Sequence, residues 1–226
     1  MLKEYLSSSI GKKQIVAVTG LMMVGFLIAH LSGNFLIFKG PDAINNYAKM
    51  LHDLGGLLWV ARIGLIIAFV AHFSFTIALV IQNRRARGVS YSTEINKRTR
   101  SLSTKLMPYS GLLLLTYVIV HLLDFTFTSA NSNNSVVNGE FLGLYGLIFN
   151  HFSKPFASLF YIVSMGAVGF HLTHGIQSVM QTYGFYHPFY TPLIKKGSII
   201  LGCLIAIGFS SIPIYILFQS ILEVKG

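Results

Sequence analysis

Charged residues are scarce in this chain of 226 residues, and acidic residues are the scarcest of them. Only 11% of the residues are charged, and Asp and Glu together number 7. Because a typical soluble domain has about 25% charged residues, this composition argues against a soluble protein. Hydrophobic residues make up 53% of the chain, and its mean hydropathy is +0.64.

Cysteine is nearly absent. The single cysteine, Cys203, excludes a disulfide framework within the chain, and the lack of a C-x-x-C-H motif argues against covalently attached haem. A signal-peptide cleavage site is also missing. The first apolar stretch is longer than a signal-peptide core and has no small-x-small site, so we expect it to be retained.

Five apolar stretches are long enough to cross a bilayer, which takes roughly 20 helical residues. They lie at about 15–38, 57–82, 106–127, 155–183 and 197–222. Backbone groups in lipid must be hydrogen-bonded within each span, and the alternating pattern of a membrane barrel is absent. The sequence therefore predicts an all-α membrane protein with five transmembrane helices in a bundle, forming a single integral membrane domain over 1–226.

The net charge of +10 is unevenly distributed. Twelve of the 17 basic residues fall on one side of an alternating five-helix topology: Lys3, Lys12, Lys13, Arg84, Arg85, Arg87, Lys97, Arg98, Arg100, Lys105, Lys195 and Lys196. The positive-inside rule then puts the N-terminus in the cytoplasm and the C-terminus outside. Topology accounts for the charge without nucleic acid, and the same basic surface suits a cytoplasmic partner.

The two outer connections differ in character. Residues 39–56 are polar, and we expect them to form a loop. Residues 128–154 begin as the polar run TSANSNNSVVNGE and continue as the apolar run FLGLYGLIFNHF. The first half of this second connection is expected to be a loop, and the second half a short interfacial segment lying on the membrane.

Histidine is the most frequent ionisable residue inside the spans. Five of the eight histidines fall there: His30, His72, His121, His171 and His174. An ionisable side chain within the membrane is costly and is a functional candidate by default. For any one of them, a hydrogen-bonded packing role is the alternative.

Two of these histidines have similar depths toward the outside. His30 follows Lys13 by 17 residues, and His121 follows Lys105 by 16. Both spans run outward, so both side chains lie roughly 24–26 Å along the helix from the inner edge. This depth pairs His30 with His121.

The other pair lies nearer the cytoplasm. His72 precedes Arg84 by 12 residues, and His171 precedes Tyr183 by 12. Both spans run inward, so each side chain lies roughly 18 Å from the inner edge. This depth pairs His72 with His171.

A pair of imidazoles from two helices at one depth suits a six-coordinate haem iron, whose ligands approach from opposite faces. A zinc site would take three or four converging ligands, with carboxylates or thiolates, which are scarce in these spans. His171 and His174 are i, i+3 neighbours on one helix face, so they cannot straddle one porphyrin. Glycines near the histidines fit either close helix packing or contact with a flat macrocycle.

Four motifs together resemble a known family. They are AHLSGNF around His30, VAHFSFTIAL around His72, VHLLDFT around His121, and FHLTHGIQS around His171. In this order they resemble the five-helix, di-haem cytochrome b subunit (b558 type) of succinate dehydrogenases and fumarate reductases. The resemblance covers essentially the whole chain, and it implies two haem b groups in the bundle.

The resemblance also implies roles for individual residues. In that family the first and third helices supply one haem's ligands and the second and fourth supply the other's, which implies the pairs His30/His121 and His72/His171. The family's H-x-x-x-G pattern matches His171 and Gly175. The resemblance therefore implies that His171, not His174, is the haem ligand. His174 would then contact the haem or its propionates. Further candidates for the propionates, or else headgroup anchors, are Arg62 and Lys105.

The function that the resemblance implies is that of the membrane anchor of succinate:menaquinone oxidoreductase (respiratory complex II) in a bacterial cytoplasmic membrane. Succinate would be oxidised at FAD in a flavoprotein subunit. Electrons would pass through an iron–sulfur subunit on the cytoplasmic face, then through both haems to menaquinone. Candidates for the quinone site near the outer face are His52, Asp53 and Asp124.

Other functions stay open at this point. The same subunit could serve a fumarate reductase working in the reverse direction, or another quinone-linked dehydrogenase. A proton-coupled transporter with a histidine relay would be expected to show broken helices and acidic residues in its spans, which are scarce here. A purely structural anchor would bind no cofactor. Whether complexes pair into dimers also stays open.

Overall fold

The computed structural model describes residues 2–85 and 102–225, and nearly all of them are helical. Among these residues, five helices are long and apolar enough to cross a membrane: Ser9–Lys39, Gly56–Arg85, Leu106–Thr126, Pro155–Thr182 and Thr191–Leu222. The expectation of an all-α membrane protein with five spans is therefore confirmed. The first and last helices begin about six residues before the apolar stretches do, because polar residues extend both helices at that end.

The chain contains eight α-helices and five shorter elements in the described ranges. The helices are α1 (Leu2–Ser7), α2 (Ser9–Asn34), α3 (Pro41–Asp53), α4 (Gly56–Arg85), α5 (Leu102–His121), α6 (Gly143–Phe152), α7 (Pro155–Thr182) and α8 (Thr191–Lys225). The shorter elements are 3-10 helices at Phe35–Lys39 and Asn133–Ser135 and the strands β1 (Val136–Val137) and β2 (Glu140–Phe141). A π-helical segment, η2 (Leu122–Thr126), continues α5.

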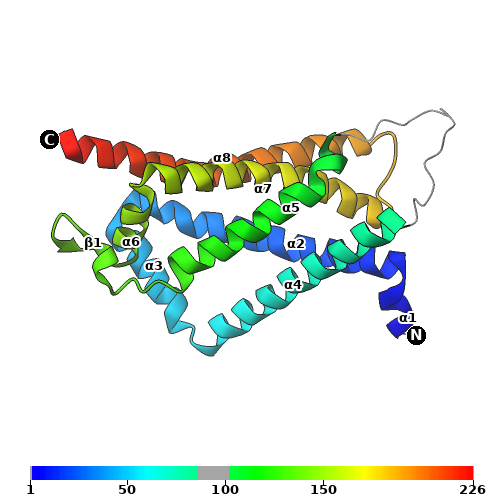
Figure 1. Ribbon diagram of the computed structural model, residues 1–226, viewed down its shortest axis with the longest axis horizontal. Coiled ribbons are helices and arrows are strands. Elements are labelled where there is room, and N and C mark those ends of the chain that lie inside the picture. The colour runs from blue at the N-terminus through cyan, green and yellow to red at the C-terminus, as the bar shows by residue number, and fades with distance from the viewer. Residues whose placement is uncertain (1, 86–101, 226) are drawn as a thin grey trace.

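The long helices form an elongated bundle with the two termini at opposite ends (Figure 1), as an odd number of spans requires. Helices α7 and α8 lie side by side along most of their length. Helix α2 packs against α4 and α7, and α5 packs against α7. Helix α4 lies at the edge of the bundle, and Ala68 is its one buried residue.

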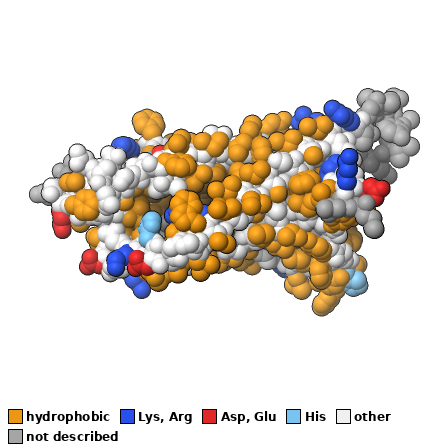
Figure 2. All heavy atoms as spheres, turned by 90° about the horizontal axis from the view of Figure 1, so that it is seen from below, with side chains coloured by type: hydrophobic (Ala, Val, Ile, Leu, Met, Phe, Trp, Pro, Cys, Tyr) orange, Lys and Arg blue, Asp and Glu red, His pale blue; other side chains and the backbone are white. Residues whose placement is uncertain are grey.

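The surface of the bundle matches a lipid environment along its middle. Figure 2 shows hydrophobic side chains covering the central part of one face, with most charged side chains near its two ends. We call the end that carries Lys12, Lys13, Arg84, Lys195 and Lys196 the basic end. The opposite end, which carries α3, α6 and the two strands, is called the cap end.

The cap end is built from the two outer connections. The residues expected to form a polar loop contain the helix α3, which begins at Pro41, a favoured first residue of a helix. The side chain of Asn45 in α3 donates to the Leu142 carbonyl at 2.9 Å and accepts from the Tyr145 amide at 3.3 Å. Asn45 thus satisfies an amide in the first turn of α6, where amides lack helical partners.

The apolar half of the second connection forms α6 as a helix, but its side chains pack against protein. Six of its ten residues are buried, and four of them form one cluster with residues of α3, α7 and α8. Before it, β1 and β2 form a hairpin whose turn residues Asn138 and Gly139 both have positive φ, as a two-residue hairpin turn requires. The expected interfacial segment is therefore part of a small folded cap.

Glycines let α7 and α8 approach closely at one point. A Cβ atom built on Gly169 would lie 2.7 Å from the Gly202 carbonyl oxygen, and one on Gly202 would lie 2.5 Å from the Gly169 carbonyl oxygen. Backbone therefore meets backbone at this crossing, as small residues allow between membrane helices. This contact fixes how closely α7 lies against α8.

Candidate functional site

The first candidate site is the cap-end pair, His30 and His121. His30 comes from α2 and His121 ends α5, and their ring centroids are 5.9 Å apart with the planes at 83°. Phe26 stacks on His30 at 5.1 Å, and Tyr117 stacks on His121 at 5.7 Å. The two imidazoles thus meet edge to face between the two helices, at the common depth that the sequence predicts. An aromatic ring stacks on each of them.

The spacing of this pair fits two ligands of one metal ion. With metal–nitrogen bonds of about 2.0 Å, two imidazoles on opposite sides of an ion have their centroids roughly 6 Å apart. The observed 5.9 Å between the His30 and His121 ring centroids is compatible with that spacing, and also with an ordinary contact between two rings. Within the described residues, no group of three or more His, Cys, Asp or Glu side chains forms a metal site, so the candidates are pairs.

The second candidate site is the basic-end pair, His72 in α4 and His171 in α7. The His72 Nδ1 lies 3.1 Å from the Val16 carbonyl oxygen and 3.3 Å from the Thr19 hydroxyl, both in α2. The His171 Nδ1 lies 3.0 Å from the Ser110 hydroxyl in α5. His72 thus joins α4 to α2, and His171 joins α7 to α5.

Glycines lie against the edges of both basic-end imidazoles. A Cβ atom built on Gly20 would lie 3.3 Å from Cε1 of His72, and one on Gly111 would lie 3.8 Å from Cε1 of His171. A larger residue at Gly20 would push the His72 ring away from α2. The small residues therefore help to keep each imidazole against the neighbouring helix.

These observations test whether the residues present suit a haem. The donor set consists of imidazole nitrogens from different helices, without carboxylate or thiolate ligands, as bis-histidine haem ligation requires. At the basic-end pair, the bonds at Nδ1 leave Nε2 of each ring free to bind iron. The four histidines therefore suit bis-histidine ligation of haem.

His174 occupies a different position from His171 on α7. It is half-buried, three residues after His171, and the Ser110 bond belongs to His171. The glycine four residues after His171, Gly175, would meet no other atom within 4 Å if it carried a Cβ. The surroundings of Gly175 thus leave open space beside this part of α7.

A third cluster joins Asp124 to two residues that sequence reasoning did not connect with it. The Tyr161 hydroxyl donates to Asp124 Oδ2 at 2.7 Å, and the His151 Nε2 lies 3.4 Å from the same oxygen. Asp124 lies in the π-helical segment η2, an irregularity that is frequent at functional sites. Tyr161 also lies beside His121, with ring centroids 6.1 Å apart. The cluster therefore adjoins the cap-end pair.

His151 is a partly buried member of this cluster, with 19% of its side chain exposed. Burial lowers the pKa of its imidazole, Asp124 opposes that shift, and Lys154 adds to it. The lowered pKa favours the neutral form of the His151 ring over the imidazolium.

The other residues predicted for the quinone site lie apart from these contacts. His52 and Asp53 are exposed in the last turn of α3, and Asp53 lies 3.8 Å from Lys49. The contacts of Asp124 are with Tyr161 and His151 instead.

Of the two residues predicted to contact haem propionates, Arg62 has a described side chain and Lys105 does not. Arg62 is half-buried in α4, with its guanidinium 5.2 Å from the centroid of the Trp59 ring, a cation–π contact. Lys105 lies in α5, but its side chain lies outside the described residues. The basic residues at 86–101 also lie outside them.

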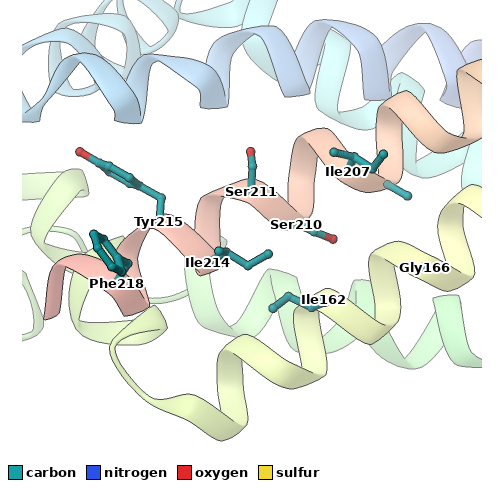
Figure 3. A pocket seen from close by; sticks show the side chains of 9 residues that line it. Ile162, Gly166, Ile207, Ser210, Ser211, Ile214, Tyr215 and Phe218 are labelled. Atoms are coloured by element: carbon teal, nitrogen blue, oxygen red, sulfur yellow. The ribbon is translucent and has the colours of Figure 1, made fainter. Parts of the chain in front are cut away.

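A groove lies between α7 and α8. Figure 3 shows Ile162 from α7 and Ile214 from α8 on its walls, with Gly166 and Ser210 further along. Its lining contains no histidine or charged side chain. The groove is therefore chemically distinct from both histidine pairs.

Sequence reasoning missed four polar residues around the histidines: Thr19, Ser110, His151 and Tyr161. The sequence does not mark Thr19 and Ser110 as partners of a histidine, because a hydroxyl in a membrane helix commonly hydrogen-bonds to the backbone of its own helix. His151 was assigned to a connection, and its contact with Asp124 depends on how α6 folds back. The run of aromatics in α7 hides Tyr161 among lipid-facing residues.

Comparison of the chain with protein families, curated proteins and solved structures finds no match.

Proposed function

We propose that this protein is a membrane electron-transfer subunit that binds two haem b groups through His30/His121 and His72/His171. The observation that supports it most strongly is the cap-end pair, two imidazoles from separate helices with centroids 5.9 Å apart. The second pair, with both Nδ1 atoms engaged and both Nε2 atoms free, supports the same chemistry. The family resemblance of the four histidine motifs points to the same ligand sets.

Haem iron, when bound, supplies reversible one-electron chemistry. The chain contributes the ligands and holds them on four different helices. Phe26 and Tyr117 pack against the cap-end imidazoles and exclude water from them. The two pairs lie toward opposite ends of the bundle, so they form two steps of a path across the membrane.

The proposed physiological role is that of the anchor of succinate:menaquinone oxidoreductase in a bacterial cytoplasmic membrane. The basic end would receive the iron–sulfur subunit, which carries electrons from FAD in the flavoprotein subunit. The excess of Lys and Arg at this end supports a cytoplasmic orientation and an acidic partner surface. Fumarate reduction is the same electron path in the reverse direction.

The Asp124 cluster is the best candidate for the quinone-reactive region of this proposal. Reduction of a quinone by two electrons also takes up two protons, so its site needs hydrogen-bonding and proton-exchanging groups. A carboxylate, a phenol and an imidazole meet here beside His121. His52 and Asp53, which are exposed and belong to α3, have no such surroundings.

Reduction of the haems by succinate tests this role directly. In membranes that contain the assembled complex, succinate is expected to reduce haem, and menaquinone is expected to reoxidise it. If haem is present but succinate does not reduce it, the succinate assignment is contradicted. Electron transfer through haem would then still hold, and another quinone-linked dehydrogenase would be favoured.

Substitutions at Asp124 test the quinone region. We expect Asp124→Asn to keep both haems and to lower the rate of haem reoxidation by quinone at least tenfold, because the amide does not exchange protons. Tyr161→Phe should act in the same direction and lower stability by about 1–2 kcal/mol through the lost hydrogen bond. Asp53→Asn is the matched control and should leave the rate unchanged. A slow Asp53→Asn variant beside a normal Asp124→Asn variant would move the quinone region to α3.

A structural anchor without cofactor is the second candidate. The contacts of His72 with α2 and of His171 with α5 are inter-helix hydrogen bonds, which stabilise membrane bundles without any ligand. This function predicts a colourless protein.

A further inference from the structure

The two histidine pairs are held in different ways. At the basic-end pair, a hydrogen bond fixes Nδ1 of each ring: His72 to the Val16 carbonyl and the Thr19 hydroxyl, and His171 to the Ser110 hydroxyl. At the cap-end pair, the His121 Nδ1 is buried and has no hydrogen-bond partner among the described residues. Stacked aromatic rings hold the cap-end imidazoles in place.

The Ser110 hydroxyl bears on which tautomer His171 adopts. A hydroxyl has a single hydrogen to donate. The Met107 carbonyl of its own helix lies 3.0 Å from the Ser110 oxygen and offers that hydrogen an acceptor. With the hydrogen directed there, the Ser110 oxygen accepts from Nδ1 of His171, and Nε2 of His171 keeps its lone pair.

Thr19 acts on His72 in the same way. Its hydroxyl donates to the Ile15 carbonyl at 2.7 Å, so its oxygen faces His72 as an acceptor. The Val16 carbonyl, which can only accept, lies 3.1 Å from the same Nδ1. Thr19 and Ser110 are both buried, so water does not compete for these contacts.

We propose that Ser110 and Thr19 are positioning residues, and that Thr19 acts together with the Val16 carbonyl. They make the basic-end imidazoles stronger electron donors than the cap-end imidazoles. This inference rests on the proposed function. A hydrogen bond donated from Nδ1 raises the basicity of the ligating Nε2. A stronger donor favours the oxidised iron, so the bonds hold the basic-end haem at a lower reduction potential than it would otherwise have.

The two hydroxyls differ in how much each controls. Ser110 is the one hydrogen-bond partner of the His171 Nδ1 among the described residues, whereas the Val16 carbonyl would still hold His72 after loss of the Thr19 hydroxyl. We therefore expect Ser110→Ala to have the larger effect and Thr19→Val the smaller one.

The test is a redox titration and a low-temperature EPR spectrum of the purified chain with its haems. Ser110→Ala is expected to raise the midpoint potential of one haem and shift its low-spin EPR signal, with the other haem unchanged. Ser110→Thr, which restores a hydroxyl, should return both readouts toward the wild type. Ser164→Ala is the matched control, because Ser164 is also buried but, among the described residues, its hydroxyl donates to the Phe160 carbonyl of its own helix and contacts no histidine.

Each outcome decides between the alternatives. Loss of one haem in Ser110→Ala that Ser110→Thr restores also supports the inference. If Ser110→Ala does not fold, Thr19→Val and its rescue Thr19→Ser carry the same test on His72. Two haems with unchanged potentials and EPR signals in Ser110→Ala and Thr19→Val overturn the inference and leave the proposed function intact. A wild-type chain without haem overturns the proposed function itself.

Discussion

Replacing His171 with alanine is expected to remove one of two haems, whereas replacing His174 with alanine leaves both. The two histidines lie on one face of α7, so they cannot bind opposite sides of one iron. His171 is the one whose Nδ1 lies within hydrogen-bond distance of the Ser110 hydroxyl. Because this contact is at Nδ1, it leaves the Nε2 atom of His171 for iron. The Ser110 contact is with His171 and not with His174.

The measurement is haem content per chain with a spectrum of the remaining haem. His72→Ala should lose the same haem as His171→Ala, and the double variant should lose no more than either single variant. His30→Ala should lose the other haem. A His174→Ala variant that loses haem, beside a His171→Ala variant that keeps two, would reverse the assignment within α7.

A methyl group at the α7–α8 crossing is expected to destabilise the bundle. Gly169→Ala places Cβ 2.7 Å from the Gly202 carbonyl oxygen, and Gly202→Ala places it 2.5 Å from the Gly169 carbonyl oxygen. Backbone cannot move aside as a flexible side chain can, so the helices must separate. Overpacking of this kind costs about 1–3 kcal/mol. Because His171 is two residues from Gly169, haem binding at the basic-end pair should weaken as well.

Thermal unfolding in detergent, followed by circular dichroism, measures this effect. Gly166→Ala is the matched control: it lies on the same helix, and a Cβ there would meet nothing within 4 Å. We expect Gly169→Ala and Gly202→Ala to melt well below the wild type and Gly166→Ala to melt with it. Equal melting of all three variants would show that the crossing is looser than the structure has it.

The five spans could be predicted from the sequence because lipid imposes length and apolarity on every helix that crosses it. Depth counting also placed His30 beside His121, since a helix advances by a fixed rise per residue. The cap could not be predicted in this way. Helix α3 is mostly polar, and its position depends on Asn45 reaching Leu142, 97 residues later in the chain.

The polar partners of the histidines were equally hidden. Ser110 and Thr19 satisfy their own helix backbone in any arrangement, so only the packing of neighbouring helices brings a histidine to them. Asp124 was a candidate from its position near His121, but its contacts with Tyr161 and His151 depend on where α6 and α7 lie. Sequence patterns thus predict what each helix contains, and tertiary packing decides what each side chain meets.

Haem content is the most direct test of the account. A pyridine haemochrome assay on the purified full-length chain, combined with a reduced-minus-oxidised spectrum, measures the type and number of haems. The account predicts two b-type haems per chain. A folded, properly assembled protein that contains no haem would contradict it and favour a structural anchor in which the four histidines only join helices.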